Sequence, residues 1–213
     1  MIESYLSVSG ENESETVIER SRFICRVKRI GNEDEARAFI EGVRKAHSQA
    51  THNCYAYVAS EDGNICRFSD DGEPQGTAGL PMLEALKNRS LAMTAAVVTR
   101  YFGGIKLGAG GLVRAYTRSV SDAVDAAGLV SMEPCTTFSV HVPYPYRNAV
   151  WSVFQRFGAI ESTDYGAEIT CAFRCRSAEA DAFLKALSDR TEGRVGAEAI
   201  GEGYFGFPIQ EQN

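Results

Sequence analysis

The sequence lacks a long hydrophobic run. None of its apolar stretches approaches the roughly 18 residues that a helix needs to cross a bilayer. Residues 1–15, MIESYLSVSGENESE, are acidic and do not place a basic segment before an apolar one, as a secretory signal peptide does. These two absences predict a cytoplasmic protein without a membrane partner.

The sequence also lacks the cysteine pattern of a disulfide-rich or zinc-binding domain. Its six cysteines have no Cys or His partners at the spacing of a zinc site. Cys171 and Cys175 are four residues apart and would share one face of a strand, where a reduced cysteine acts as a small hydrophobic side chain. We therefore expect structural thiols and no metal centre.

Positive charge is in short supply. The chain has 22 Lys and Arg residues against 28 Asp and Glu residues, which gives a net charge of −6. This excess of acid argues against non-specific nucleic-acid binding by the whole surface. The charges are uneven, however, because residues 99–118 carry four basic side chains and no acid, while residues 61–73 carry five acids and one base. A local basic patch beside an acidic loop is therefore compatible with the overall sign.

Two glycine-bearing stretches stand out in the middle of the chain. They are DDGEPQGTAG from residue 70 and RYFGGIKLGAGGLVRAY from residue 100. Glycine is costly inside a regular element, so such a cluster predicts unusual backbone dihedral angles or a close approach of the backbone.

The hydrophobic pattern predicts an α/β domain over residues 1–133. Residues 14–30 are expected to form a half-exposed strand, and a helix capped by Asn32 follows. Thr77 is expected to cap a second helix. The nearly continuous apolar run at 92–101 predicts a central strand, and a third helix is expected from about 109 to 127.

Residues 134–213 form the second predicted domain. Their pattern predicts the order strand, helix, strand, strand, helix, strand, which is the ferredoxin-like arrangement of an antiparallel sheet with helices on one face. The expected fold class is therefore α+β, in two domains.

These stretches resemble the YigZ/IMPACT family. The resemblance rests on DGEPQGTAGLPMLEAL and VVTRYFGGIKLGAGGLVRAYTRSV, with support from HNCYAY at 52–57 and RFSDDGEP at 67–74. It implies a first domain like the second domain of a small-subunit ribosomal protein, a fold shared with domain IV of elongation factor G and with GHMP-type kinases. It implies a ferredoxin-like second domain similar to domain V of elongation factor G.

The resemblance also implies a role. Eukaryotic members regulate translation by antagonising the activator of a stress kinase, and they carry an additional N-terminal partner-binding domain that is not expected in this chain. For bacterial members, nucleic-acid binding is the usual inference. The expected function is therefore an RNA- or ribosome-associated regulator of translation, without the stress-kinase role.

The basic stretch is the main candidate site. A glycine-rich turn that leads into a helix leaves backbone N–H groups free at the positive end of the helix dipole, where a phosphate can bind. The candidate anion-binding or nucleic-acid-binding residues are Arg100, Gly103, Gly104, Lys106, Gly108, Gly110, Gly111, Arg114 and Arg118. The spacing fits neither a Walker A loop nor a dinucleotide fingerprint. In the alternative reading, the glycines permit tight packing and Arg118 pairs with Asp122.

The acidic stretch is expected to support this site. Its residues are Asp70, Asp71, Glu73 and Thr77. The acids are expected to pair with Arg100 or Lys106, and binding of Mg²⁺ is the alternative. No other cofactor is expected.

No catalytic residue is expected. His52 and Cys54 would share a strand face, but a third group to orient them is missing. The aromatic residues near the site are expected to be core residues, although exposed ones could stack on bases: Tyr55, Tyr57, Tyr101, Phe102 and Tyr116.

Two further functions stay open at the level of sequence. One is an enzyme that acts on a phosphorylated small molecule or nucleotide, with the glycine loop on the phosphate and Asp70 or Asp71 as base or metal ligand. The other is a protein-binding module that uses the ferredoxin-like sheet.

Overall fold

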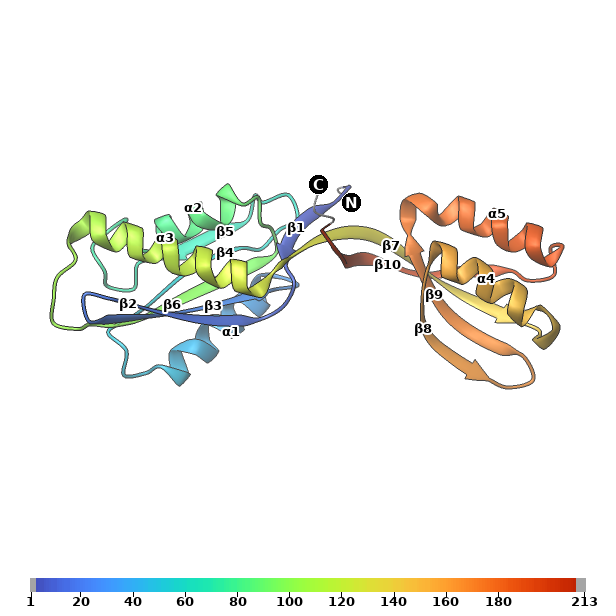
Figure 1. Cartoon of the computed structure of the whole chain (residues 1–213), viewed down its shortest axis with the longest axis horizontal. Helices are drawn as coiled ribbons and strands as arrows, with labels where there is room; N and C mark the ends of the chain where they lie inside the picture. The colour runs from blue at the N-terminus through green and yellow to red at the C-terminus, as the bar shows by residue number, and fades with distance from the viewer. Residues whose placement is uncertain (1–2, 210–213) are drawn as a thin grey trace. The chain divides into compact units, whose positions relative to one another are not determined.

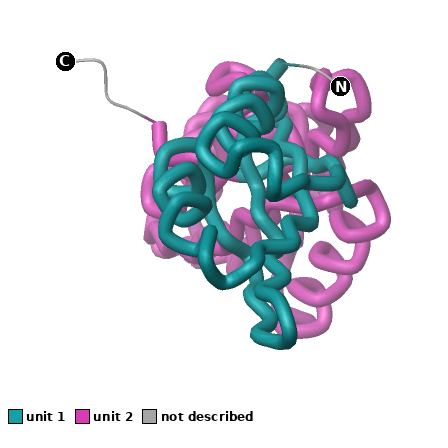
Figure 2. The backbone as a smooth tube through the Cα atoms, turned by 90° about the vertical axis from the view of Figure 1, so that its right-hand side faces the viewer, with its two compact units in different colours: residues 1, 3, 133–205 teal, residues 2, 4–132, 206–213 magenta. Residues whose placement is uncertain are grey.

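A computed structural model describes residues 3–209 of the chain. The chain separates into two compact units, which Figure 2 shows in different colours. We call residues 4–132 with 206–209 the N-terminal unit, and residues 133–205 the C-terminal unit. Both combine helices with antiparallel strands, so the α+β fold class is confirmed. Residues 210–213, with which the second predicted domain ends, lie outside the described residues.

The N-terminal unit is built on an antiparallel sheet with the strand order β2-β3-β6-β4-β5. The strands are β2 (Asn12–Ile18), β3 (Ser21–Arg29), β4 (His52–Val58), β5 (Cys66–Ser69) and β6 (Thr94–Tyr101). Strand β6 lies at the centre and is buried at every position except Tyr101. Its apolar run therefore forms the expected central strand.

Helices cover both faces of this sheet (Figure 1). Helix α1 (Glu33–Ala46) packs on one face, over a core that includes Ile40 and Val97. Helices α2 (Gly79–Asn88) and α3 (Gly108–Ala127) pack on the other face. The expected cap of α1 is present, because the Asn32 side chain accepts a hydrogen bond from the backbone N–H of Glu35 at 2.8 Å.

Two local expectations are wrong. Residues 14–30 form two strands, β2 and β3, because Glu19 and Arg20 adopt positive φ angles of 47° and 64° and turn the chain back. Thr77 does not cap α2. Its hydroxyl donates to the carbonyl oxygen of Pro74 at 2.6 Å, and the first N–H groups of α2 instead donate to Asp70.

The C-terminal unit has the ferredoxin-like order. Its elements are β7 (Leu129–Val142), α4 (Arg147–Phe157), β8 (Gly158–Tyr165), β9 (Ile169–Arg176), α5 (Ala180–Thr191) and β10 (Ala197–Pro208), with short 3-10 turns at Tyr144–Tyr146 and Ser177–Glu179. The sheet order is β10-β7-β9-β8, and α4 and α5 lie on one face of it (Figure 1). Phe154, Phe173 and Phe183 join helices and sheet, with ring centroids 4.3 to 4.6 Å from the Phe173 ring.

Strand β1 (Tyr5–Val8) pairs with the first residues of β7, at 129–132. Among residues 3–209, no helix is both long and apolar enough to cross a membrane.

Candidate functional site

The acidic loop lies between β5 and α2, and its first carboxylate builds the start of α2. Asp70 Oδ1 accepts from the backbone N–H groups of Ala78 and Gly79 at 3.0 and 2.8 Å, and Oδ2 accepts from Gly76 at 2.8 Å. A carboxylate at this place satisfies free N–H groups and favours the helix dipole. Asp70 is therefore the helix cap that the sequence analysis assigned to Thr77.

The second carboxylate, Asp71, ties the loop to the start of β4. Its Oδ2 accepts from the backbone N–H of Asn53 at 2.6 Å, and its Oδ1 lies 3.2 Å from Arg44 Nη2. Its carbonyl oxygen accepts from His52 Nδ1 at 2.8 Å. The residue has a φ of 44°, in the left-handed region that Asp tolerates better than most side chains. These contacts make Asp71 a structural residue of the loop.

The third carboxylate, Glu73, forms a buried ion pair with Arg100. Arg100 Nη1 lies 2.6 Å from Glu73 Oε1, which also accepts from the Tyr116 hydroxyl at 2.8 Å. Arg100 Nη2 donates to Ser21 Oγ at 3.3 Å. The expected pairing of the acidic loop with Arg100 is thus present. Arg100, predicted as a free anion-binding residue, already has a carboxylate partner.

A tyrosine and a cysteine complete this buried network. Cys54 Sγ lies 2.9 Å from the carbonyl oxygen of Asp70 and 3.4 Å from Tyr116 Oη, and its single S–H donates to one of these acceptors at a time. Burial raises the pKa of Cys54 to about 12, and burial is also the largest cause that raises the pKa of Tyr116. At neutral pH Cys54 is a thiol and not a nucleophilic thiolate.

The three acids do not converge on one point. Asp70 faces the backbone of α2, Asp71 faces β4 and α1, and Glu73 faces Arg100. Within the described part of the chain, no group of three or more His, Cys, Asp or Glu side chains is placed to hold a metal ion.

The glycines of the basic stretch have different roles. A Cβ on Gly103 would lie 2.1 Å from the carbonyl carbon and oxygen of Arg20, closer than any real contact, so Gly103 permits tight packing on the β2–β3 turn. Gly104 and Gly108 have φ angles of 86° and 69°, which glycine adopts without strain. Gly111 packs on Leu107, where a Cβ would be 2.9 Å away. Gly110 has room for a side chain, since the nearest atom to a Cβ would be Arg114 Nη1 at 3.5 Å. Packing and dihedral angles therefore explain most of the cluster.

Three of the four predicted cations share one surface. Lys106, Arg114 and Arg118 are exposed and line a shallow depression of about 890 Å³ between the end of β2 and the first turns of α3. We call this depression the basic hollow. Arg118 lies 3.4 Å from Asp122, so the ion pair named in the alternative reading is present. Lys106 and Arg114 have no ion-pair partner within residues 3–209. Arg100 does not line the hollow.

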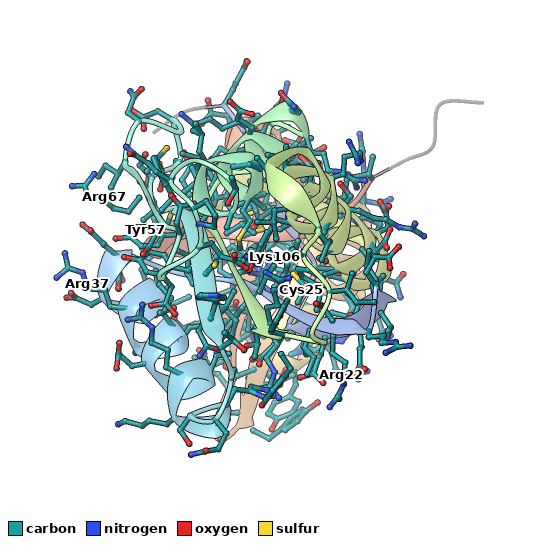
Figure 3. All side chains as sticks on the ribbon, turned by 90° about the vertical axis from the view of Figure 1, so that its left-hand side faces the viewer. Arg22, Cys25, Arg37, Tyr57, Arg67 and Lys106 are labelled. Carbon is teal, nitrogen blue, oxygen red and sulfur yellow. The ribbon has the colours of Figure 1, made fainter. Side chains whose placement is uncertain are left out.

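A second depression lies on the other side of Lys106. It has a volume of about 410 Å³, and we call it the α3 cleft. Its polar lining includes His52, Glu73, Arg100 and Lys106, together with the first residues of α3. The residue before α3, Leu107, makes no side-chain cap, and no other side chain within residues 3–209 caps the start of this helix. Figure 3 looks at the end of the N-terminal unit where α3 begins and shows Lys106 near the middle of that face.

A third groove, of about 420 Å³, lies on the α1 side of the sheet and contains three arginines and two of the predicted tyrosines. Its cations are paired: Arg37 lies 3.0 Å from Glu33, Arg44 lies 3.1 Å from Glu41, and Arg67 lies 4.0 Å from Glu33. Tyr57 is buried and donates to Glu33 at 2.7 Å. Figure 3 shows Arg37, Tyr57 and Arg67 on the side of α1, away from Lys106. Because the arginines of this groove are already in ion pairs, we assign the groove a structural role.

The sequence analysis missed Ser21. Its hydroxyl accepts from Arg100 Nη2 and from the backbone N–H of Gly103 at 3.2 Å, and so joins the β2–β3 turn to the glycine loop. No local pattern could have identified it, because its partners are about 80 residues away along the chain.

Comparisons with known proteins agree on one family. The Impact N-terminal domain matches residues 19–124, and a domain of unknown function, DUF1949, matches residues 140–194. The chain is 42% identical to the IMPACT family member YvyE of Bacillus subtilis (strain 168), covering 91% of this chain and 90% of YvyE. It is 37% identical to the IMPACT family member YigZ of Escherichia coli (strain K12), covering 87% and 92%.

A solved structure is similar over nearly the whole chain. It is described as the crystal structure of a hypothetical protein and is 34% identical, with a TM-score of 0.61, covering 94% of this chain and 99% of that one. The protein IMPACT homolog of Schizosaccharomyces pombe (strain 972) is 32% identical over 100 residues, which are 45% of this chain and 35% of that protein. The family model and the long bacterial matches include both stretches of the candidate site. The chain therefore belongs to the IMPACT family.

Proposed function

We propose that this chain is an RNA-binding protein of the translation apparatus and that it holds RNA phosphates in the basic hollow. The observation that carries the proposal is the pair Lys106 and Arg114, two exposed cations without an ion-pair partner in the described chain, beside the uncapped start of α3. Phosphate contacts supply most of the affinity of sequence-independent RNA binding. The proposal requires no catalytic step.

Two features weaken the electrostatic attraction of the basic hollow for RNA. Arg118 is partly neutralised by Asp122, and Glu19 also lines the hollow. The net charge of −6 opposes RNA elsewhere on the surface. Binding is therefore expected to be local and strongly dependent on salt. The resemblance to domains of elongation factor G supports ribosomal RNA as the first class of RNA to test.

The experiment measures the affinity for a single-stranded RNA by fluorescence anisotropy over a series of salt concentrations. Each phosphate contact on a single strand contributes about 0.7 to the slope of log K against log salt concentration. Lys106→Ala with Arg114→Ala is expected to reduce the slope by about 1.4. Arg118→Ala is expected to have a smaller effect than Arg114→Ala, because Asp122 already neutralises it.

Lys87→Ala is the matched control. Lys87 is an exposed cation in the last turn of α2. That end of α2 lies beside the end of α3, since Arg89 pairs with Asp125. The control therefore removes one positive charge at the opposite end of α3 from Lys106, and its slope should equal that of the wild type. An unchanged slope in the Lys106 and Arg114 double variant would exclude the basic hollow as the RNA site.

A further inference from the structure

We propose that the α3 cleft is a second binding site, which shares Lys106 with the basic hollow, and that its ligand is a nucleotide with a terminal phosphate. The volume of about 410 Å³ is in the range of small-molecule pockets, about 300–1,000 Å³. Its chemistry differs from that of the basic hollow. The lining of the cleft combines a buried arginine, a histidine and a glutamate with apolar side chains.

One buried polar group in the lining of the cleft lacks a hydrogen-bond partner. Arg100 is 95% buried, since its side chain is 5% exposed. Its Nη1 and Nη2 donate to Glu73 and Ser21, but within residues 3–209 its Nε has no hydrogen-bond partner. A buried donor without an acceptor is costly, and such groups usually find a ligand or a water molecule.

The net charge of the cleft is positive and therefore favours an anionic ligand. Glu73 neutralises Arg100, so Lys106, which has no ion-pair partner in the described chain, supplies the net positive charge. Gly108 and Ala109 bring the first turn of α3 to the same cleft, and no side chain in the described part of the chain caps that turn. Free N–H groups at the start of a long helix bind phosphate groups. Lys106 and these N–H groups together suit a phosphate.

His52 and Glu73 present two acceptors for a hydroxyl group. The carbonyl oxygen of Asp71 can only accept, so His52 Nδ1 carries a proton and donates to it at 2.8 Å. In the neutral ring, Nε2 is then an acceptor. It lies 3.8 Å from Glu73 Oε2, too far for a direct hydrogen bond. A hydroxyl group that enters the cleft, such as one on a ribose, can donate to either atom.

An exposed aromatic side chain in the lining of the cleft suits a flat ring. Phe102 is 46% exposed although it lines the cleft. Its backbone N–H donates to Thr51 Oγ1 at 3.1 Å, and the Arg100 guanidinium lies 5.4 Å from its ring centroid. These contacts hold Phe102 at the wall of the cleft. Aromatic side chains in such positions stack on bases. Phosphate, hydroxyl and flat ring together describe a nucleotide.

The test is isothermal titration of the full chain with AMP, adenosine and inorganic phosphate. AMP is expected to bind at least about tenfold more tightly than either fragment, because only AMP carries both the phosphate and the flat ring. Phe102→Ala is expected to weaken AMP binding about tenfold through the loss of stacking, and Phe102→Leu by a similar factor, since it retains apolar area without an aromatic face. Phe102 is exposed, so both variants are expected to fold, which thermal melting checks.

The outcomes separate this site from the RNA proposal. Arg114→Ala is expected to lower the salt slope of RNA binding and to leave AMP binding unchanged, because Arg114 does not line the cleft. Absence of AMP binding, or AMP binding that Phe102→Ala does not weaken, would overturn the nucleotide site and leave the basic hollow untouched.

A free nucleotide and the end of an RNA strand carry the same chemical group. Competition with AMP by an RNA with a 5′-phosphate, and not by the same RNA with a 5′-hydroxyl, assigns the cleft to a strand end. If neither RNA competes while AMP still binds, the cleft is a site for free nucleotides.

Discussion

Arg100 and Glu73 form an ion pair inside the N-terminal unit, with 2.6 Å between Nη1 and Oε1 and side-chain exposures of 5% and 3%. Arg100 is the next-to-last residue of β6 and Glu73 lies in the loop before α2, so the pair joins the two glycine-bearing stretches of the sequence. Glu73 also accepts a hydrogen bond from the Tyr116 hydroxyl of α3. The pair therefore connects the acidic loop, β6 and α3 within the candidate site.

Removing one charge of this pair should be strongly destabilising. Glu73→Gln keeps the shape but leaves Arg100 buried without a counter-charge, and the expected loss is about 3–5 kcal/mol of unfolding free energy. Chemical denaturation measures it. The exposed pair of Arg118 and Asp122 is the control, because Asp122→Asn should cost less than about 1 kcal/mol.

A double variant separates charge from packing. Glu73→Leu with Arg100→Met removes both charges, and it is expected to be more stable than Glu73→Gln, because no unpaired charge stays buried. If Glu73→Gln were as stable as the wild type, the pair would not be buried in solution.

Two neighbouring glycines should respond differently to alanine. Gly103→Ala would place Cβ 2.1 Å from the carbonyl carbon and oxygen of Arg20, so the β2–β3 turn or the glycine loop must move. Gly104→Ala meets open space, and its cost is the left-handed backbone, about 1–2 kcal/mol. Thermal melting should show a much larger loss for Gly103→Ala. Equal losses would contradict the close approach of the two loops.

The cysteines should differ in their reactivity. Cys66 is partly exposed, while the other five are buried, and burial raises the pKa of Cys54 to about 12. At pH 8 an alkylating reagent should modify Cys66 first and Cys54 at least about a hundredfold more slowly, since the thiolate is the reactive form. Peptide mass spectrometry measures both rates. Alkylation in denaturant, where all six should react alike, is the control, and fast labelling of Cys54 in the folded chain would contradict its burial.

Much of the fold was predictable from local patterns. The apolar run of β6, the Asn32 cap of α1 and the element order of the C-terminal unit each follow from side-chain periodicity or capping chemistry. Strand β2 was not, because its residues are intermediate and exposed in alternation, and Val17 is largely exposed. A strand without a buried face has no strong hydrophobic signal.

For the candidate site, the pairing of the acidic loop with Arg100 was predictable, and the role of Asp70 was not. Arg100 follows Val98 by two residues in β6, so the alternation of a strand directs it to the core under α2 and α3. That signal was present and indicates a buried arginine. The role of Asp70 was not accessible, because a carboxylate that folds back onto backbone N–H groups depends on the loop conformation. Whether Lys106, Arg114 and Arg118 bind RNA stays a prediction.

The pairing of β7 with β10 has a consequence for synthesis of the chain. The ribosome makes α4, β8, β9 and α5 between these two neighbouring strands. Until β10 emerges, one edge of β7 has unpaired backbone groups, and such an edge can pair with other chains. Residues 4–132, which are most of the N-terminal unit, have been synthesised long before β10 emerges. The nascent C-terminal unit is therefore the part of the molecule in which delayed synthesis should favour aggregation.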